Sequence, residues 1–447
     1  MGETPAFLND TFAFTMERAA KYGTVFRTHL FGNPTVVIAD FLNYKKVFYG
    51  DHKLVQQQFP PSVPALLGPN SARPFLDDDF HRTMRRTLNP AFKPEALATY
   101  LPAVQEIVEG FLEDAERQGA VPLYPLVKNV TFEFASRLLL CIDLDDESRK
   151  HLPQRFTEMA AGLYSSMINL PGTTWHRARS ARDYILAVLE EGTQTIAAQV
   201  RAGEQPERPS LFFQAVRMLH QDGDPLEPRS LAYQALGLFF GGHDTTAGGY
   251  SVLLAYLPQL PRVMQKLREE QQRVVAKHGT ALTQAAMAEM PYATACVMEG
   301  LRLLGPVRVV FRVALKDFEL NGKRIPKGTR VVVAVDAVHA LDPSIATDAS
   351  RASLLPPHMD RDNLEVSFVP ERWLDEATKP TGIGSFGMGP HLCLGMPLYI
   401  AEAKALLAIT ARSYKLSLPN GRMQWERTFP QPVPTADTLL RVTRLAS

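Results

Sequence analysis

The hydrophobic pattern of this chain is mostly that of amphipathic helices. Apolar residues that recur at spacings of three and four fall on one face of a helix. Four segments show this spacing: 103–118, 184–202, 210–220 and 261–278. Ser210 stands at the start of the third segment as a candidate N-cap. The middle of the chain is therefore predicted to be helical, and a further helix is expected at about 397–414.

Strand-like patterns are confined to two shorter regions. Segments 25–30 and 35–38 flank the turn-forming sequence FGNP, which predicts a hairpin. The sequence FELNGKRIPKGTRVVVAV has turn signals at Asn321-Gly322 and Lys327-Gly328. These patterns predict a mainly α fold with a smaller β portion at about 23–40 and 318–336. Because no Gly/Ser-rich linker divides the chain, we expect a single domain over residues 1–447.

Charge and cysteine content narrow the class of protein. The 48 basic and 47 acidic residues nearly cancel, which argues against a nucleic acid partner. The three cysteines, Cys141, Cys296 and Cys393, are too few and too scattered for a disulfide framework. The chain also contains no C-x-x-C pair, which disfavours a cysteine-based zinc site. A reducing compartment is therefore expected.

Membrane spans are not indicated by the hydrophobic pattern. A spanning helix needs about 20 mostly apolar residues. The long uncharged stretches 54–72, 159–176 and 245–261 all contain proline, and the first two are rich in polar residues. The N-terminus also lacks a signal-peptide pattern. The chain is predicted to be soluble and cytoplasmic, although an anchor removed from the N-terminus would leave no signal.

The glycine-rich stretch GIGSFGMGPHLCLG, residues 382–395, has two interpretations. Gly382, Gly384 and Gly387 spell G-x-G-x-x-G, which cradles dinucleotide phosphates when a strand precedes it and a helix opens within it. The preceding DEATKPT does not look like a buried strand, and Pro390 falls where the helix should be under way. The chain also lacks regular β-α-β alternation. These departures argue against nucleotide binding.

The second interpretation makes Cys393 a thiolate ligand for a metal. It precedes a predicted helix, whose positive dipole end and unbonded N–H groups favour thiolate over thiol. Gly387 and Gly389 would let the backbone lie against a flat ligand. His391 could donate a hydrogen bond to an anionic group on that ligand. A buried structural cysteine is one alternative. A Cys393–His391 nucleophile pair is another, which the closeness of the two residues disfavours.

The same stretch resembles the haem-ligand loop of the cytochrome P450 family. Phe386, Gly389, Cys393 and Gly395 stand at the positions of that motif. The family often has arginine where this chain has His391, and histidine also occurs there in soluble bacterial members. The resemblance runs from about residue 23 to 444. It implies a P450 fold that holds haem b between an oxygen-activating helix and the cysteine loop. Cys393 is then the axial ligand of the iron, and Phe386 and Gly395 contact the haem.

A second motif, EGLR, lies in a predicted helix. Glu299 and Arg302 are three residues apart and so share one helix face. A buried carboxylate must be fully paired, so a second arginine is expected, and Arg372 in FVPERW is the candidate. By itself E-x-x-R is common and usually a solvated pair. The resemblance implies a structural triad of these three residues.

A third motif, GLFFGGHDTTAGGY, interrupts an apolar helix with an acid and two hydroxyls. Gly241 and Gly242 each cost a helix about 1 kcal/mol relative to alanine, which suggests that the backbone passes close to a flat cofactor or makes room for a small ligand there. A glycine-rich core helix is the alternative. The resemblance implies the oxygen-activating helix, with Asp244 and Thr245 as the catalytic acid–alcohol pair. Thr245 would hold an ordered water, and Asp244 would link that water to solvent.

The resemblance also implies which side chains bind the carboxylates of the haem. FHRTMRRTLNPAF resembles the haem-contacting helix, with His81 where tryptophan is more usual and Arg85 four residues later. Arg312 matches a further carboxylate-binding position, and His391 would add another contact. Exposed cations near the cysteine side would dock an acidic electron donor. The candidates are Arg82, Arg86 and Lys93.

The substrate is expected to be bulky and apolar. The three uncharged stretches fall where P450 enzymes line their substrate cavity, and Val307, Val309 and Val310 add apolar surface. Segments 162–185 and 306–328 resemble the branch that oxidises retinoids, steroids and terpenoid hormones. Arg308 departs from that branch. Facing inward it could pair with a substrate carboxylate, and facing outward it would be solvated.

Together these features predict a haem-thiolate monooxygenase that hydroxylates a retinoid-, steroid- or terpenoid-like molecule. It would use dioxygen and two electrons from a redox partner, either a ferredoxin with its reductase or a flavoprotein reductase. The protein is expected to be a monomer. A hydroperoxide isomerase or peroxygenase on the same fold is an alternative, which Asp244 and Thr245 disfavour. A dinucleotide-dependent dehydrogenase and a haem-binding sensor are alternatives from other classes.

Overall fold

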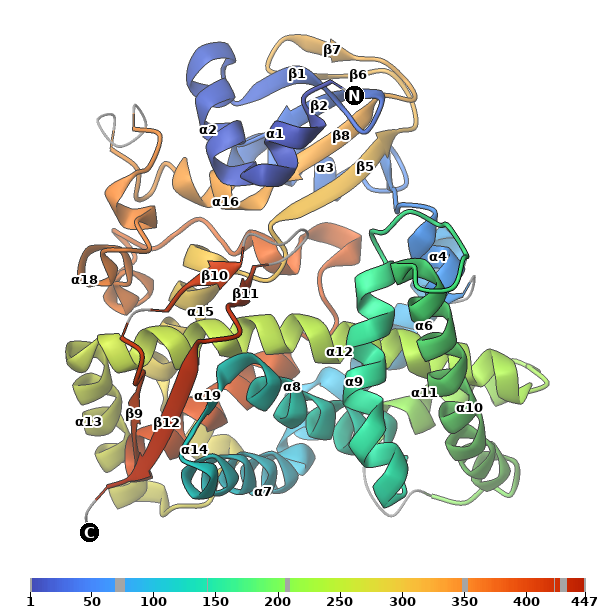
Figure 1. The fold of residues 1–447 in the computed structure, drawn as a ribbon, viewed down its shortest axis with the longest axis vertical. Helices are drawn as coiled ribbons and strands as arrows, with labels where there is room; N and C mark the ends of the chain where they lie inside the picture. The colour runs from blue at the N-terminus through green and yellow to red at the C-terminus, as the bar shows by residue number, and fades with distance from the viewer. Residues whose placement is uncertain are drawn as a thin grey trace. The chain divides into compact units, whose positions relative to one another are not determined.

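The computed structural model describes residues 2–68, 77–142, 144–205, 210–347, 353–421, 423–426 and 432–445. Within this described part, whose helices and strands are drawn in Figure 1, the chain divides into two compact units. Unit 1 comprises Met1–Gln58, Val108–Val127 and Thr245–Ser447, and unit 2 comprises Phe59–Ile107 and Lys128–Asp244. The single domain expected from the sequence stays a prediction.

Among the described residues of unit 1, five strands form a mixed sheet in the order β1-β2-β8-β5-β3. They are β1 (Val25–Leu30), β2 (Asn33–Ile38), β8 (Arg330–Ala334), β5 (Val309–Ala314) and β3 (Val55–Gln57). β1 and β2 form the predicted hairpin. Its turn residues, Phe31 and Gly32, have positive φ angles of 51° and 74°, as tight hairpin turns require. β2 runs parallel to β8, which joins the N-terminal hairpin to the later strand region.

The remaining strands of the described chain are short. β6 (Phe318–Leu320) and β7 (Lys323–Ile325) pair around the predicted turn at Asn321 and Gly322, where φ is 47° and 70°. A separate sheet has the order β4-β12-β9. Its strands are β4 (Ala120–Pro122), β12 (Leu439–Arg444) and β9 (Tyr414–Ser417), and a further pair consists of β10 (Trp425–Glu426) and β11 (Val433–Pro434).

Helix α3 (Phe41–Tyr49) packs against the main sheet of unit 1. Its residues Tyr44 and Val47 are fully buried in one apolar cluster with Ile38 and Val333 of the sheet. Fully burying a large apolar side chain contributes about 1.5–3 kcal/mol. This cluster therefore fixes α3, which in turn contacts the cysteine loop.

The other helices of unit 1 include the predicted helices over 261–278 and 397–414. They are α1 (Thr4–Asn9), α2 (Thr11–Tyr22), α13 (Pro261–His278), α14 (Gln284–Ala288), α15 (Pro291–Leu304), α16 (Val335–Ala340), α18 (Leu364–Ser367) and α19 (Met396–Ser413). Helices α13, α15 and α19 pack against one another. Short 3-10 helices are η3 (Leu257–Gln259), η4 (Pro357–Met359), η5 (Pro370–Trp373), η6 (Gly384–Phe386) and η7 (Gly389–His391).

Among the described residues of unit 2, the regular elements are all helices. Its elements are α4 (Ser62–Leu67), α6 (Asp78–Leu88), η1 (Asn89–Phe92), the π-helix η2 (Ala135–Leu140), α9 (Asp146–Gly162), α10 (Thr174–Arg201) and α11 (Leu211–Gln221). α9 and α10 lie side by side (Figure 1). Helices α7 (Pro94–Gln118), α8 (Leu123–Phe134) and α12 (Pro228–Tyr256) have residues in both units.

The predicted helices over 103–118, 184–202 and 210–220 fall within α7, α10 and α11. The predicted N-cap of α11 is confirmed, because Ser210 Oγ accepts a hydrogen bond from Phe213 N–H at 3.1 Å. The same hydroxyl donates to Leu140 O at 3.0 Å, which ties the start of α11 to η2.

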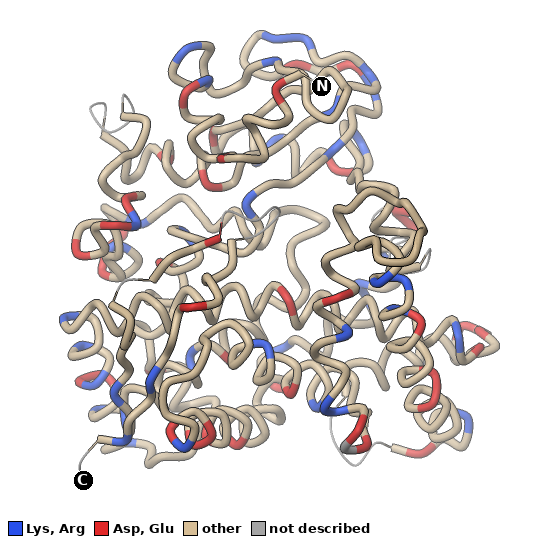
Figure 2. The backbone as a smooth tube through the Cα atoms, viewed as in Figure 1, with Lys and Arg blue, Asp and Glu red and all other residues tan. Residues whose placement is uncertain are grey.

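Acidic and basic positions are interspersed along the backbone of both units (Figure 2), in keeping with the formal net charge of +1. None of the described helices has both the length and the apolar character needed to cross a bilayer. Of the uncharged stretch 54–72, residues 69–72 lie outside the described residues.

Candidate functional site

The cysteine loop, residues 382–395, turns back on itself through backbone hydrogen bonds. Cys393 N–H donates to Phe386 O at 2.8 Å, so the two motif residues lie next to each other. The side chain of Cys393 is exposed, whereas Cys296 on α15 is fully buried. Cys393 is therefore accessible to a ligand, and the alternative of a buried structural cysteine is wrong.

Gly387 and Gly389 both have positive φ angles, 72° and 63°. A Cβ added at Gly389 would lie 2.8 Å from Phe48 O, and one added at Gly387 would lie 3.1 Å from the Phe48 ring. The sequence suggested that these glycines admit a flat ligand. In the structure they admit the C-terminal end of α3, because the loop packs directly on it.

The sulfur of Cys393 lies beside the N-terminus of α19. A Cβ placed on Gly395, the residue before this helix, would be 4.0 Å from Cys393 Sγ, and no side chain caps the helix among the described residues. The free N–H groups and the positive end of the helix dipole stabilise a thiolate there. Thiolate is a ligand of haem iron in P450 enzymes. The donor chemistry at Cys393 therefore fits haem.

His339 on α16 joins the loop to α15. Its Nε2 accepts a hydrogen bond from Gly384 N–H at 2.9 Å, and its Nδ1 donates to Arg302 O at 3.0 Å. The ring is buried, and burial lowers the pKa of His339 to about 4. A neutral imidazole has one donor and one acceptor nitrogen, so the ring satisfies both contacts at neutral pH. Sequence reasoning missed this residue, a single histidine in the apolar run VVVAVDAVHAL.

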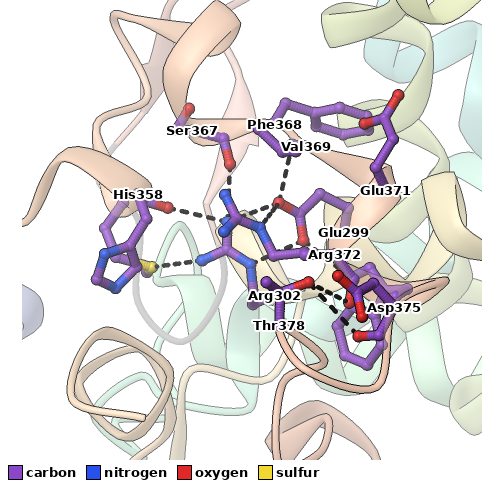
Figure 3. A network of polar contacts seen from close by, with 12 residues as sticks. Glu299, Arg302, His358, Ser367, Phe368, Val369, Glu371, Arg372, Asp375 and Thr378 are labelled. Carbon is purple, nitrogen blue, oxygen red and sulfur yellow. Dashed lines mark hydrogen bonds and ion pairs between the residues drawn. The ribbon is translucent and has the colours of Figure 1, made fainter. Parts of the chain in front are cut away.

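Glu299 is the centre of the predicted triad, and the structure brings its three members together (Figure 3). The carboxylate is fully buried and accepts from Arg302 at 2.8 and 2.9 Å and from Arg372 at 3.0 Å. Val369 N–H and Trp373 Nε1–H also donate to it, at 3.0 and 2.9 Å. Burial by itself would raise the pKa of Glu299, but the two arginines hold it below its ordinary value.

Arg302 also binds the segment that leads to Arg372 (Figure 3). Its Nη2 donates to Ser367 O at 2.8 Å and to His358 O at 2.9 Å. Because the carbonyl of Arg302 accepts from His339, the triad and the cysteine loop belong to one hydrogen-bonded network. The structural role predicted for the triad stays a prediction, and these contacts connect it to the loop.

His391 has a protein partner that the sequence did not predict. Its Nε2 lies 2.6 Å from Nε2 of His52, and both rings are half-buried. A hydrogen bond between two imidazoles needs one N–H and one bare nitrogen. The contact with the haem predicted for His391 stays a prediction, and His52 becomes a candidate neighbour for the same group.

Arg312 is paired with a carboxylate of the protein itself. Its Nε and Nη2 donate to Oδ1 and Oδ2 of Asp51 at 2.7 and 3.1 Å, and both side chains are buried. Burial raises the pKa of Asp51, an effect that the hydrogen bonds from Arg312 partly offset. The haem contact predicted for Arg312 stays a prediction.

Arg308 donates to Asp336 at 2.5 Å, and Arg361 donates to the same carboxylate oxygen at 3.1 Å. Burial by itself would raise the pKa of Asp336, but the two arginines hold it below its ordinary value. The side chain of Arg308 is 14% exposed, so it lies against an internal carboxylate rather than in solvent. Val309 is buried, and Val307 and Val310 are half-buried.

The glycines of α12 have different neighbours. A Cβ at Gly241 would meet no heavy atom within 4 Å among the described residues, so this position is open. A Cβ at Gly242 would clash with Leu139 of η2, and one at Gly249 would clash with the hydroxyl of Tyr399. Helix packing therefore accounts for Gly242 and Gly249, and the contact with the cofactor predicted for Gly241 and Gly242 stays a prediction.

Asp244 and Thr245 are consecutive residues of α12. The side chain of Asp244 is 13% exposed and forms an ion pair with Lys128 of α8, whose side chain is 7% exposed. Thr245 is half-buried, and the next residue, Thr246, is buried. The structure thus gives the predicted catalytic acid a cationic partner that sequence reasoning missed.

Helix α6 carries the two other residues predicted to contact the haem. His81 is buried and Arg85, about one turn later, is half-buried. Of the predicted docking cations, Arg82 is bound by Asp78 at 2.9 Å and Asp79 at 2.5 Å. Such exposed ion pairs are weak. Arg86 and Lys93 are exposed.

A family model described as Cytochrome P450 matches residues 6–345 and 366–439 of this chain. The chain belongs to the cytochrome P450 family. Among solved structures, retinoic acid bound cyanobacterial CYP120A1 is similar, with a TM-score of 0.83 and 28% identity. That match covers 100% of this chain and 97% of the other.

Sequence relatives in the P450 family come from animals, a plant and a cyanobacterium. Cytochrome P450 26A1 of Xenopus laevis is 30% identical over 94% of this chain and 84% of its own length. Beta-amyrin 28-monooxygenase of Barbarea vulgaris is 29% identical over 91% of this chain and 79% of its own length.

Membership of the P450 family confirms the predicted mainly α fold with its smaller β portion, and it confirms the monooxygenase class. The family implies a haem cofactor, a hydrophobic substrate, dioxygen and a redox partner. It gives no support to the dinucleotide interpretation of Gly382, Gly384 and Gly387. The roles of individual residues in this P450 stay predictions.

The Glu299 carboxylate should be essential for the stability of this P450. Glu299→Gln leaves Arg302 and Arg372 buried without their anion, and breaking a buried ion pair in this way costs about 3–5 kcal/mol. We expect a large fall in unfolding temperature and in haem retention. Glu365→Gln is the matched control, because that carboxylate is exposed and lies 3.5 Å from Arg262. An E299Q protein as stable as the control would contradict the triad's role.

His339 should make the stability of this P450 depend on pH. Because the pKa in the folded protein, about 4, lies below the ordinary value of 6.5, stability from this group is complete above pH 6.5 and declines towards pH 4. One pKa unit is worth about 1.4 kcal/mol, so the loss is on the order of a few kcal/mol. Denaturant unfolding at several pH values should show that His339→Gln removes this part of the decline.

His220→Gln, a change at an exposed histidine of α11, is the control for the pH series and should leave the wild-type slope intact. If H339Q and wild type lost stability in parallel as the pH falls, His339 would not be the neutral link between the loop and α15.

Proposed function

We propose that this P450 is a haem-thiolate monooxygenase that hydroxylates a bulky hydrophobic molecule of the retinoid, steroid or terpenoid class. The observation that carries the proposal is the exposed Cys393 at the N-terminus of α19. The overall reaction is RH + O₂ + 2 e⁻ + 2 H⁺ → ROH + H₂O. Two similar proteins support the substrate class: one solved structure is retinoic acid bound cyanobacterial CYP120A1, and one relative is named for its action on beta-amyrin.

The cofactor is haem b, held through Cys393. When bound, its iron supplies the redox chemistry by which dioxygen is reduced. His81, Arg85, Arg312 and His391 are the candidates for binding its carboxylates. Arg312 would do so while it is held in place by Asp51. This arrangement matches the general rule that a carboxylate is bound best by charged, pre-oriented donors.

Asp244 and Thr245 handle the two protons that each turnover consumes. Thr245 donates a hydrogen bond into the site and holds an ordered water. Asp244 carries protons between that water and solvent. These two roles follow from the chemistry of the side chains. A hydroxyl both donates and accepts hydrogen bonds and so can bind a water molecule, whereas an ionised carboxylate can accept a proton and pass it on.

The substrate is bound mainly by apolar contact. Val307, Val309 and Val310 lie at or on β5, which the main sheet of unit 1 holds in place. Arg308 is bound to Asp336, so a substrate carboxylate would have to compete with that side chain. Apolar burial therefore determines affinity more than ion pairing does.

The electron donor is a ferredoxin with its reductase, or a flavoprotein reductase. Arg82, Arg86 and Lys93, which are all exposed, are the candidates for docking an acidic donor. Such contacts steer association and weaken as the salt concentration rises. The monomeric state and cytoplasmic location expected from the sequence stay predictions.

A panel of retinoids, steroids and terpenoids tests the substrate class. The purified haem-loaded protein is titrated with each compound, and displacement of water from the iron is followed as an absorbance shift. At least one class should bind and yield a hydroxylated product only with dioxygen and a reductant. Turnover with peroxide only would favour a peroxygenase, and no response across the panel would contradict the assigned branch.

Thr245→Ala should separate reductant consumption from product formation. Without the hydroxyl the proposed ordered water would lose its partner, and more of the dioxygen would be reduced to peroxide by the net reaction O₂ + 2 e⁻ + 2 H⁺ → H₂O₂. We expect product per electron pair to fall several-fold while peroxide rises. Thr246→Ala is the matched control at the neighbouring buried hydroxyl. An unchanged ratio of product to reductant in T245A would contradict the assigned role.

A further inference from the structure

Lys128 forms a largely buried ion pair with Asp244 in unit 2. Its ammonium contacts Oδ1 of the carboxylate. The two side chains are 7% and 13% exposed. Lys128 is also the one charged residue in the first ten residues of α8, LYPLVKNVTF. A lysine in so apolar a stretch calls for a specific partner, because burying an ammonium without one is costly.

The backbone next to the pair is held by packing and a hydrogen bond. One turn after Lys128, the hydroxyl of Thr131 lies 2.9 Å from Nδ1 of His243, the residue before Asp244. The His243 ring is buried and packs on Phe239 and Phe156, with centroids 5.5 and 6.0 Å away. These contacts fix the backbone of α12 on α8, so the position of the Asp244 carboxylate depends on its own side-chain partner.

His243 does not compete with Lys128 for the carboxylate. Burial, helped by the nearby Lys128 charge, holds the pKa of His243 well below its ordinary value, so the ring is neutral at neutral pH. Lys128 is thus the cationic partner that the described residues give to Asp244. The contact occupies Oδ1 and leaves Oδ2 available to a water molecule.

We infer that Lys128 is a positioning residue for proton delivery. It holds Oδ1 of Asp244, so that Oδ2 is oriented to exchange protons with the water bound by Thr245. The inference rests on the proposed monooxygenase function and deepens it. Each turnover takes two protons, so the carboxylate must return to the same place after every transfer. A fixed ammonium restores that position, whereas a carboxylate without it is free to adopt other rotamers.

A purely structural ion pair would have different consequences. Its loss would lower the stability or haem content of the protein. In the molecules that still fold and bind haem, the yields of product and of peroxide per electron pair would remain those of wild type. If Lys128 positions Asp244, its loss should instead lower the product yield per electron pair and slow proton transfer. Product yield per electron pair and the solvent deuterium isotope effect on turnover are therefore the deciding readouts.

The experiment compares Lys128→Met, Lys128→Arg and the control Lys150→Met in the full haem-loaded chain. Lys150 is an exposed residue of α9. In K128M we expect product per electron pair to fall several-fold, peroxide to rise and the solvent isotope effect to increase. K128R keeps the charge and should recover most of the wild-type yield, and K150M should match wild type. Haem content and substrate binding are measured in every variant.

A double variant tests whether Lys128 acts through Asp244. If it does, the double variant K128M/D244N should give the same product per electron pair as Asp244→Asn alone. The carboxylate that Lys128 holds is already absent in the single variant. If K128M does not fold, Lys128→Gln takes its place, since the amide keeps a hydrogen-bond donor without the charge. K128Q should uncouple turnover as K128M would.

The failure of this inference can be told apart from failure of the proposed function. If wild type binds haem and couples turnover but K128M or K128Q has the same yield and isotope effect, Lys128 has no role in proton delivery. Strictly additive losses in the double variant would also overturn the inference. If the wild-type protein forms no thiolate-bound haem, the proposed function fails, and the inference falls with it.

Discussion

The proposed thiolate of Cys393, at the N-terminus of α19, is the feature on which the function of this P450 depends. The helix end and the turn at Cys393 provide N–H groups and a positive dipole end, which favour thiolate. The sulfur remains accessible because the loop folds back on Phe386 instead of burying Cys393 in the core. Two glycines with positive φ permit this path by letting the loop lie against α3.

The supporting structure consists of buried charges that are all partnered. Glu299 is bound by Arg302 and Arg372, and Arg302 reaches the cysteine loop through the neutral ring of His339. Such networks contribute little net stability compared with apolar packing, but they are costly to break. Their value here is geometric: the loop that carries the sulfur is fixed from α15 and from α3. The same logic applies in unit 2, where Lys128 fixes Asp244.

Local features of the fold could be predicted from sequence because their signals are local. The turn at Phe31-Gly32, the N-cap Ser210 and the helical spacing of Glu299 and Arg302 each depend on residues a few positions apart. Arg372 was found because a buried carboxylate needs a second cation and the family resemblance supplied its place. Cys393 stood out because glycines and a helix start surround it.

Long-range partners could not be predicted in the same way. Asp51, His339 and Lys128 contact residues that are far away in the chain. The sequence around a single charged or polar residue does not identify such a partner. The same limit on prediction from sequence applies to the neighbours of two glycines. Gly242 and Gly389 indicated that something approaches the backbone, but only the structure identifies Leu139 and Phe48 as the neighbours. For the same reason the sequence left the orientation of Arg308 open, whereas the structure pairs it with Asp336.

The most direct test of the central claim is the absorption spectrum of the reduced, haem-loaded protein with carbon monoxide. Thiolate ligation by Cys393 predicts a strongly red-shifted Soret band, which Cys393→His should move back to the position typical of histidine-bound haem. An unshifted band in the intact wild-type protein, or a red-shifted band that survives in C393H, would contradict the account.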